Sequence, residues 1–99
     1  MNYIVYDSIE VFDYIEQLSS YLRRNNLPVD YDLSRRSFSK QIAEAENKKS
    51  KKIIIVSKED LETNGEVILR DSFQMTDRKI NITKGFDELV HELVEIRLG

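Results

Sequence analysis

The spacing of apolar residues in the first quarter of the chain predicts a strand followed by a helix. Residues 3–6 are apolar or aromatic over the length of a short strand. Asp7 and Glu10 match the two positions of a capping box, so Asp7 is expected to cap a helix that runs to about Arg24 and stops before Pro28. Apolar residues recur in this helix at steps of four, three and four, the spacing of one helical face: Val11, Ile15, Leu18 and Leu22.

The next segment predicts a short strand with one polar face and then a second helix. The apolar positions of the strand are Val29, Tyr31 and Leu33, which alternate with Asp30 and Asp32. Residues 34–37 are expected to form a loop, and Ser37 is expected to cap the second helix. The inner face of that helix is predicted to carry Phe38, Ile42 and Ala45.

Four consecutive apolar residues, Ile53 to Val56, show no polar alternation. This pattern is typical of a central strand that is covered on both faces. The residues that follow, up to Gly65, are rich in turn formers and are expected to form a turn. Residues 67–70 and 79–82 then predict a β-hairpin.

The end of the chain predicts a last helix, opened by Thr83 or Asp87. Its apolar stripe consists of Phe86, Leu89, Val90, Leu93 and Ile96. The predicted order is therefore β-α-β-α-β-β-β-α, and strands separated by helices imply parallel pairing. At 99 residues the chain is expected to form a single domain, residues 1–99. The predicted fold class is α/β, a three-layer mixed sheet, mostly parallel, of about five strands with three helices.

Residues suited to catalysis or metal binding are scarce. The chain has no cysteine, which excludes disulfides, thiolate metal sites and a cysteine nucleophile. His91 has acidic neighbours at helical spacing and is interpreted as a surface residue rather than a general base. Asp30 and Asp32 could hold a cation, but protection of a strand edge explains them equally well. We therefore predict no catalytic residue, no metal and no cofactor.

The longest apolar run has only four residues, far fewer than the roughly 20 that a membrane-spanning helix needs. The first residues carry no cationic segment of the kind that begins a signal peptide. We therefore expect a cytoplasmic protein without a membrane partner.

Charge is divided into zones along the chain. Residues 1–22 carry four acids and no base, residues 23–58 ten bases and four acids, and residues 59–99 five bases and ten acids. The zones have net charges of −4, +6 and −5, although the whole chain has only −3. The total therefore says little about the partner, which depends on how the fold brings the zones together.

In open, mostly parallel sheets, ligands bind beyond the carboxyl ends of the strands. In the predicted fold, two loops meet there. One would carry Arg35 and Arg36, and the other Lys58 and Asp60. Arginine forks suit phosphates and carboxylates accept from base amino groups, so this arrangement favours a single-stranded or folded nucleic acid. The alternative is that the arginines are simply solvated loop charges.

The stretch "VDYDLSRRSFSKQIAEAENKKSKKIIIVSKEDLETNGEVILRD", residues 29–71, resembles the anticodon-binding domain shared by class II aminoacyl-tRNA synthetases for histidine, glycine, threonine and proline. It is most similar to the histidyl version. The chain departs from the family where Arg35, Ser39 and Ser57 replace usual glycines. The residues that fall in family positions are Asp32, Leu33, Ser34, Arg36, Ser37, Lys40, Gln41, Ala45, Ile53 to Val56, Asp60, Leu61, Gly65, Val67, Leu69, Arg70 and Asp71.

The resemblance implies a non-catalytic module that binds the anticodon of tRNA. It places Asp60 and Arg70 on the surface that reads the bases, while Arg35, Arg36 and Lys40 would hold phosphates. The purely structural alternatives are a cap for Asp60 and a cross-strand ion pair for Arg70. The module would serve a catalytic domain absent from this chain, either as an excised part of a synthetase or as a free-standing relative.

A second hypothesis is an interaction module. Similar domains form the carboxyl-terminal parts of a translation-regulating kinase and of a mitochondrial polymerase accessory subunit, where the fold serves dimerisation or protein docking. The missing glycines favour this alternative, because they remove positions where backbone approaches a ligand closely. A protein partner or a homodimer therefore stays open beside tRNA.

Overall fold

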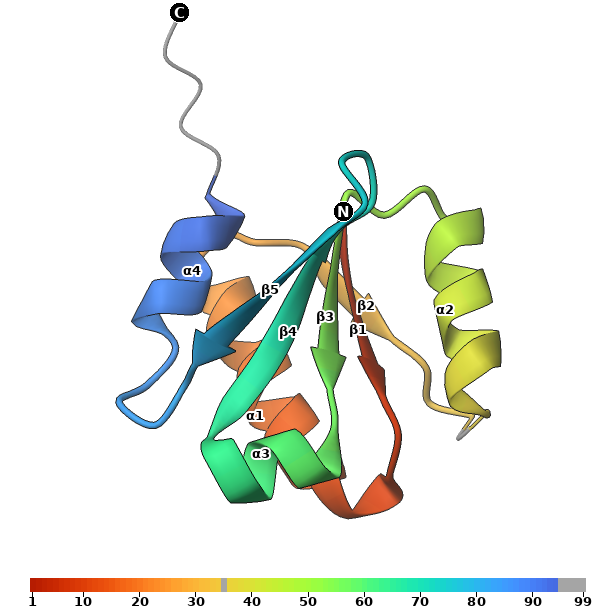
Figure 1. The fold of residues 1–99 in the computed structure, drawn as a ribbon. Helices are drawn as coiled ribbons and strands as arrows, with labels where there is room; N and C mark the ends of the chain where they lie inside the picture. The colour runs from red at the N-terminus through yellow and green to blue at the C-terminus, as the bar shows by residue number, and fades with distance from the viewer. Residues whose placement is uncertain (35, 95–99) are drawn as a thin grey trace, which may run out of the picture.

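A computed structural model describes residues 1–34 and 36–94. Strands and helices alternate through most of the chain, and a hairpin precedes the last helix (Figure 1). The strands are β1 (Asn2–Tyr6), β2 (Val29–Tyr31), β3 (Lys52–Val56), β4 (Glu66–Asp71) and β5 (Thr76–Asn81). The helices are α1 (Phe12–Arg24), α2 (Phe38–Asn47), α3 (Lys58–Asn64) and α4 (Asp87–Leu93), and a 3₁₀ turn, η1 (Ile9–Val11), precedes α1.

The five strands form one mixed sheet in the order β2-β1-β3-β4-β5. β1 pairs in parallel with β2 and β3, whereas β4 pairs antiparallel with β3 and β5. The apolar strand β3 is therefore central, as its sequence predicts, and Ile53 to Val56 are all buried. The predicted hairpin is confirmed by the pairing of β4 with β5.

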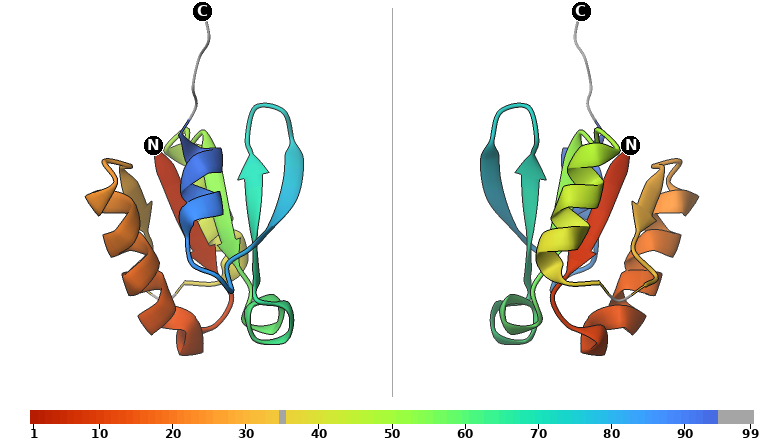
Figure 2. Two further views of the ribbon diagram at one scale, coloured as in Figure 1. Left: turned by 90° about the vertical axis from the view of Figure 1, so that its left-hand side faces the viewer. Right: turned by 90° about the vertical axis from the view of Figure 1, so that its right-hand side faces the viewer.

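Helices cover the sheet on both faces, which confirms the three-layer architecture. The larger core lies between the sheet and helices α1 and α4, and it contains the predicted stripe residues Ile15, Leu18 and Leu22. The smaller core lies on the other face, where Ala45 of α2 packs among residues of β1 and β3. The hairpin of β4 and β5 stands apart from the helices over part of its length (Figure 2).

The described residues form four α-helices rather than the predicted three, because residues 58–64 form α3 instead of a turn. None of the α3 residues is fully buried, so this helix lacks the apolar stripe that reveals a helix in a sequence. It ends at Gly65, whose φ of 61° lies in the left-handed region, and the Asn64–Gly65 signal is therefore a helix terminus.

The predicted capping role of Asp7 is wrong. Ser8 caps the first turn, where its hydroxyl accepts a hydrogen bond from the backbone N–H of Glu10 at 3.2 Å. The Asp7 carboxylate instead accepts from the backbone N–H of Lys58, the first residue of α3, at 2.9 Å. A capping box describes local geometry only, whereas this cap joins segments far apart in the chain.

Two predicted inward-facing residues are exposed, and polar neighbours take their places. β2 ends at Tyr31, so the strand alternation does not reach Leu33, which is 72% exposed, and Asp32 is buried. In α2, Phe38 is 38% exposed while Gln41 is buried beside Ala45. Both polar side chains find hydrogen-bond partners inside the fold, which apolar periodicity cannot anticipate.

The last helix begins at Asp87, one of the two predicted starts, and buries Leu89 and Leu93. The predicted stripe residue Ile96 lies outside the described residues. Across residues 1–34 and 36–94, no helix is both long enough and apolar enough to span a membrane.

Candidate nucleic-acid interface

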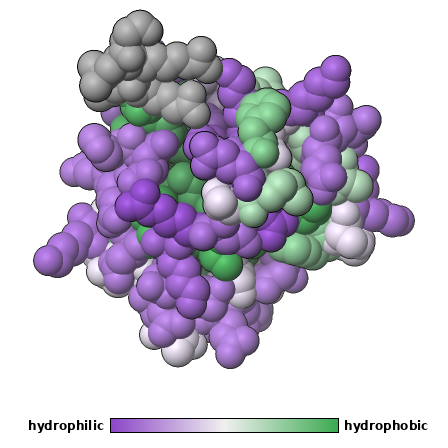
Figure 3. All heavy atoms as spheres, turned by 45° about the horizontal axis from the view of Figure 1, so that its top comes forward, coloured by the Kyte–Doolittle hydropathy of each residue, from purple (hydrophilic) through white to green (hydrophobic). Residues whose placement is uncertain are grey.

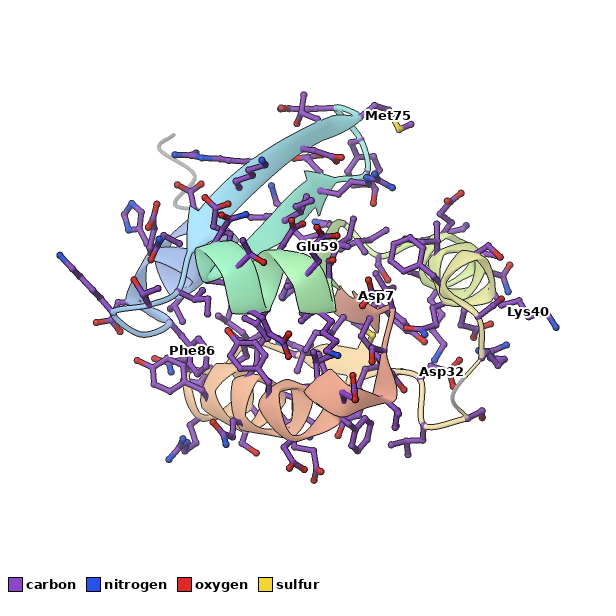
Figure 4. All side chains as sticks on the ribbon, turned by 60° about the horizontal axis from the view of Figure 1, so that its bottom comes forward. Asp7, Asp32, Lys40, Glu59, Met75 and Phe86 are labelled. Atoms are coloured by element: carbon purple, nitrogen blue, oxygen red, sulfur yellow. The ribbon has the colours of Figure 1, made fainter. Side chains whose placement is uncertain are left out.

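The two predicted loops lie on either side of Asp7, which directly follows β1 (Figure 4). The loop after β2 contributes Arg36 to a hollow of about 350 Å³ that Asp7 also lines. The Asp7 carboxylate holds the other loop through the backbone N–H of Lys58. The further lining residues of this hollow are Tyr6, Ser8, Ile9, Ser37, Phe38 and Gln41.

Arg36 is anchored by a buried carboxylate. Its Nε atom donates to Asp32 Oδ2 at 2.5 Å, and the backbone N–H of Ser34 donates to Oδ1 at 2.6 Å. Burial would raise the pKa of Asp32, but the bonds from Arg36 and Ser34 outweigh it and hold that pKa below its ordinary value. The Arg36 side chain remains 41% exposed, so its terminal nitrogens can still reach a ligand.

Gln41 fixes the position of the same loop from within the fold. Its amide oxygen accepts from the backbone N–H of Tyr6 at 2.9 Å, and its amide nitrogen donates to the backbone carbonyls of Tyr6 and Arg36, each at 2.9 Å. The paired register of β1 with β2 ends at Ile4, and Gln41 takes the place of a neighbouring strand beside Tyr6. The buried amide therefore ties α2 and the Arg36 loop to the end of β1.

The second loop is held by an ion pair and by the first turn of α3. Lys58 Nζ pairs with the Glu10 carboxylate, and this contact raises the pKa of Lys58 and lowers that of Glu10. Asp60 is half-buried in the first turn of α3. Its negative charge interacts favourably there with the positive end of the helix dipole. Lys40 is exposed near the start of α2 and extends away from Asp32 into solvent (Figure 4). The predicted site residue Arg35 lies outside the described residues.

Arg70 lies away from the other predicted site residues. It stands opposite Ile53, near the amino end of β3, whereas Asp60 follows the carboxyl end of that strand. Arg70 forms the cross-strand ion pair that its sequence position allowed, since Nε and Nη2 bond the two oxygens of Asp77 at 2.8 and 3.0 Å. Asp60 and Arg70 therefore lie toward opposite ends of the sheet, because the antiparallel β4 runs back along β3, and their predicted place on the surface that reads the bases stays a prediction.

The fold pairs several cations of the basic zone, residues 23–58, with acids. Arg36 and Lys48 pair with acids of their own zone, whereas Lys52 and Lys58 pair with acids of the two neighbouring zones. The pairs that involve these cations are Arg36–Asp32, Lys48–Asp30, Lys52–Asp71 and Lys58–Glu10. Within the described chain, no group of three or more histidines and acids is arranged to hold a metal ion.

A model of the anticodon binding domain family matches residues 3–96. The chain belongs to the anticodon-binding domain family. This match covers nearly the whole sequence, including the first strand and the last helix, where the motif comparison rests on element order alone. The predicted family is thereby confirmed.

Curated relatives of this anticodon-binding domain are histidine–tRNA ligases. Those of two Prochlorococcus marinus strains, AS9601 and MIT 9301, are 43% and 41% identical to it over 68 residues. The aligned part is 69% of this chain and 16% of each relative, so the chain spans a small fraction of their length.

Solved structures show the same fold. The histidyl-tRNA synthetase of S. aureus matches with a TM-score of 0.80 and 22% identity over 94% of this chain and 26% of that one. The RNA binding domain of threonyl-tRNA synthetase from Cryptosporidium parvum Iowa II matches with a TM-score of 0.79 and 16% identity, over 94% and 22% of the two chains. These similarities confirm the predicted architecture.

For three residues that position the candidate site of this anticodon-binding domain, the sequence alone did not predict the role. Gln41 belongs to the family motif, yet its burial is visible only in the fold. Asp77 carries no motif and lies outside the predicted second hairpin strand, residues 79–82, whereas β5 begins at Thr76 and sets Asp77 opposite Arg70. Glu10 contacts Lys58, which lies far along the sequence at the start of α3, and no local pattern indicates this pair.

Proposed function

We propose that this chain is a non-catalytic tRNA-binding module that contacts an anticodon loop. The observation that carries the proposal is the match of the anticodon binding domain family to residues 3–96. The exposed basic groups near the carboxyl end of the sheet and the separate arginine on the hairpin support it. Nothing in the proposed role requires bond chemistry by this chain, because binding alone positions the RNA.

The phosphate contacts belong to the carboxyl end of the sheet. Arg36 uses Nε for Asp32, and its Nη2 is 3.9 Å from Glu44, so its outer nitrogens can donate to phosphate oxygens. Lys40 is exposed beside it and adds a flexible positive charge. Arg35, by its place in the sequence, and Lys58, on the opposite loop, extend this group.

The base contacts fall into two areas. Asp60 can accept from base amino groups at the carboxyl end, while Arg70 can donate to base acceptors on the hairpin. A strand of five residues spans about 17 Å, so no single base reaches both side chains. An RNA loop that touches both must extend along the sheet, and at its Arg70 end it would lie on the face that carries α2, where Lys79 and Asp77 of β5 are exposed.

The chain spans 16% of the histidine–tRNA ligases that it matches. We therefore assign attachment of the amino acid to a catalytic domain outside this chain. In this proposal the module holds the anticodon loop while such a domain, on the same or another chain, acts on the acceptor end. A partnership of this kind would place the protein in the cytoplasm.

A protein-docking role is the second candidate, and the turn of the hairpin favours it. Phe73 and Met75 are 74% and 80% exposed there. The end of the molecule that carries this turn is mainly hydrophilic, interrupted by a few hydrophobic side chains (Figure 3). Gel filtration at two protein concentrations tests self-association, which a concentration-dependent dimer would support and a constant monomer would contradict.

Binding to RNA at several salt concentrations tests the main proposal. The probe is bulk tRNA in a filter-binding assay, followed by short anticodon stem-loops. Neutralised phosphates release counterions, so the logarithm of the binding constant should fall linearly with the logarithm of salt concentration. Binding that does not change with salt, or no binding at micromolar protein, would overturn the tRNA proposal.

A further inference from the structure

Arg70 and Asp77 form a side-by-side pair across the hairpin. The antiparallel register of β4 and β5 sets the two residues directly opposite each other, so both side chains leave the same face of the sheet. Arg70 donates from Nε to Oδ1 at 2.8 Å and from Nη2 to Oδ2 at 3.0 Å. Two parallel hydrogen bonds hold the guanidinium plane in one orientation, which a single bond would not do.

This mode of pairing leaves one edge of the guanidinium open. The group has five N–H donors, and the bonds to Asp77 use Nε–H and one N–H of Nη2. The remaining three belong to Nη1 and Nη2, which together form a second, parallel fork at the end of the side chain. Among residues 1–34 and 36–94, no group accepts from Nη1, so this end fork has no partner inside the described chain.

The surroundings keep the pair accessible. The side chains of Arg70 and Asp77 are 35% and 46% exposed. The adjacent cross-strand pair on the same face is Ile68 with Lys79, and Lys79 is exposed. The core on this face reaches the hairpin at Ile68 of β4 but includes no described residue of β5, and Glu46 of α2 adds a second negative charge near Arg70.

We infer that Asp77 is a positioning residue that aims the end fork of Arg70 at two adjacent hydrogen-bond acceptors of a bound RNA. The inference rests on the proposed tRNA binding and adds the ligand chemistry of one contact. Two sources in RNA supply such a pair of acceptors: O6 and N7 of guanine, and two oxygens of a phosphate. A side chain held on both oxygens of Asp77 meets either of them without first losing rotamer freedom.

Fluorescence anisotropy with labelled RNA stem-loops tests the inference on the whole chain. The loops carry either one guanine or none, and a third set carries 7-deazaguanine, which lacks the N7 acceptor. If guanine is the source, the wild-type protein prefers the guanine loop about tenfold and loses the preference with 7-deazaguanine. If a phosphate is the source, all loops bind alike, and the Arg70→Ala variant lowers the salt slope by about one unit.

In both cases Asp77→Ala should produce the defect of Arg70→Ala, and the double variant should be no worse than either one. Glu92→Gln is the matched control, because it removes the partner of Arg78, the next residue of β5, on the opposite face. Circular dichroism and thermal unfolding establish that each variant is folded.

Three results would overturn the inference. Asp77→Ala could leave the preference and the salt slope unchanged, which means that Arg70 needs no positioning. It could tighten binding to every loop equally, which means that Asp77 only competes with RNA for Arg70. Failure of the wild-type protein to bind any stem-loop would instead reject the proposed function itself, and the inference with it.

Discussion

The Asp7 carboxylate, directly after β1, accepts a hydrogen bond from the backbone N–H of Lys58 at 2.9 Å, across 51 positions of the sequence. The Asp7 side chain thus caps α3 and lies between the loop that carries Arg36 and the loop that carries Lys58. α3 has no fully buried residue, so this contact adds to the attachment that Leu61 provides by packing against the larger core. The ion pair between Lys58 and Glu10 reinforces it at the same point.

Replacement of Asp7 by alanine should destabilise the domain by about 1 kcal/mol, the usual cost of losing a helix cap. Urea unfolding at neutral pH measures the change. Asp7→Asn should retain most of the stability, because its amide oxygen can still accept from Lys58. Equal stability of the alanine variant and the wild type would show that α3 does not depend on this cap. Asp13→Ala, an exposed acid at the start of α1, serves as the comparison for loss of charge alone.

Replacement of Gln41 by methionine should cost more, about 3 kcal/mol, because it removes the two buried hydrogen bonds between the Gln41 amide and the backbone of Tyr6. Methionine has a similar volume, so the loss reflects hydrogen bonds rather than a cavity. The same variant should weaken RNA binding, since the carbonyl of Arg36 also loses its donor. A stable variant with normal affinity would contradict the role of Gln41 in holding this loop.

Gly65→Ala should also be destabilising, by at least about 1 kcal/mol, because the residue has a φ of 61° at the end of α3. A Cβ atom there would lie 2.3 Å from Cγ2 of Thr83, and this clash adds to the backbone strain. Thr83→Ser removes that methyl group and keeps the hydroxyl that donates to Asn81. The double variant should therefore recover part of the loss in thermal unfolding. Full recovery would assign the whole effect to the clash.

Acid should weaken the fold through Asp71. The hydrogen bond from Lys52, at 2.8 Å, and those from the backbone of Gln74 and Phe73 lower the pKa of this carboxylate. Its ordinary value is 3.8. The unfolded chain therefore binds more protons below about pH 5, and the stabilisation is complete above that pH and is lost as the pH falls through the lowered folded pKa.

Urea unfolding between pH 7 and pH 3 checks this dependence. Asp71→Asn should be less stable at pH 7 and should lose less stability on acidification than the wild type. Glu16→Gln is the control, an exposed acid on α1. Parallel pH profiles for wild type and Asp71→Asn would contradict the assignment.

Lys40→Ala should reduce the salt slope of RNA binding by roughly 0.7 to 1, the share of one phosphate contact, without a change in stability. Lys40 is exposed, so its loss should leave the fold intact. Lys84→Ala removes an equally exposed cation from the loop between β5 and α4. If both variants reduce the slope alike, the contact is general charge attraction rather than a phosphate site at the start of α2.

Sequence patterns predict the elements that depend on burial. The central place of Ile53 to Val56, the stripe of α1 and the β4–β5 hairpin are all confirmed, because a side chain that must leave water repeats with the period of its strand or helix. The family motif is equally local, and its match extends over residues 3–96. The sequence patterns did not predict α3, because this helix buries no residue completely and its apolar residues therefore show no helical periodicity.

The site depends on which loops and strand ends the fold brings together. Sequence alone determined the basic and acidic zones, the apolar strand and the motif that marks the family. Only the tertiary structure decided that Asp7 caps a distant helix, that Gln41 stands in for a strand beside Tyr6, and that Arg70 pairs with Asp77 far from Asp60. The reason is physical: burial of apolar surface follows local periodicity, whereas polar contacts between segments depend on register and strand direction, which are settled only when the whole sheet has formed.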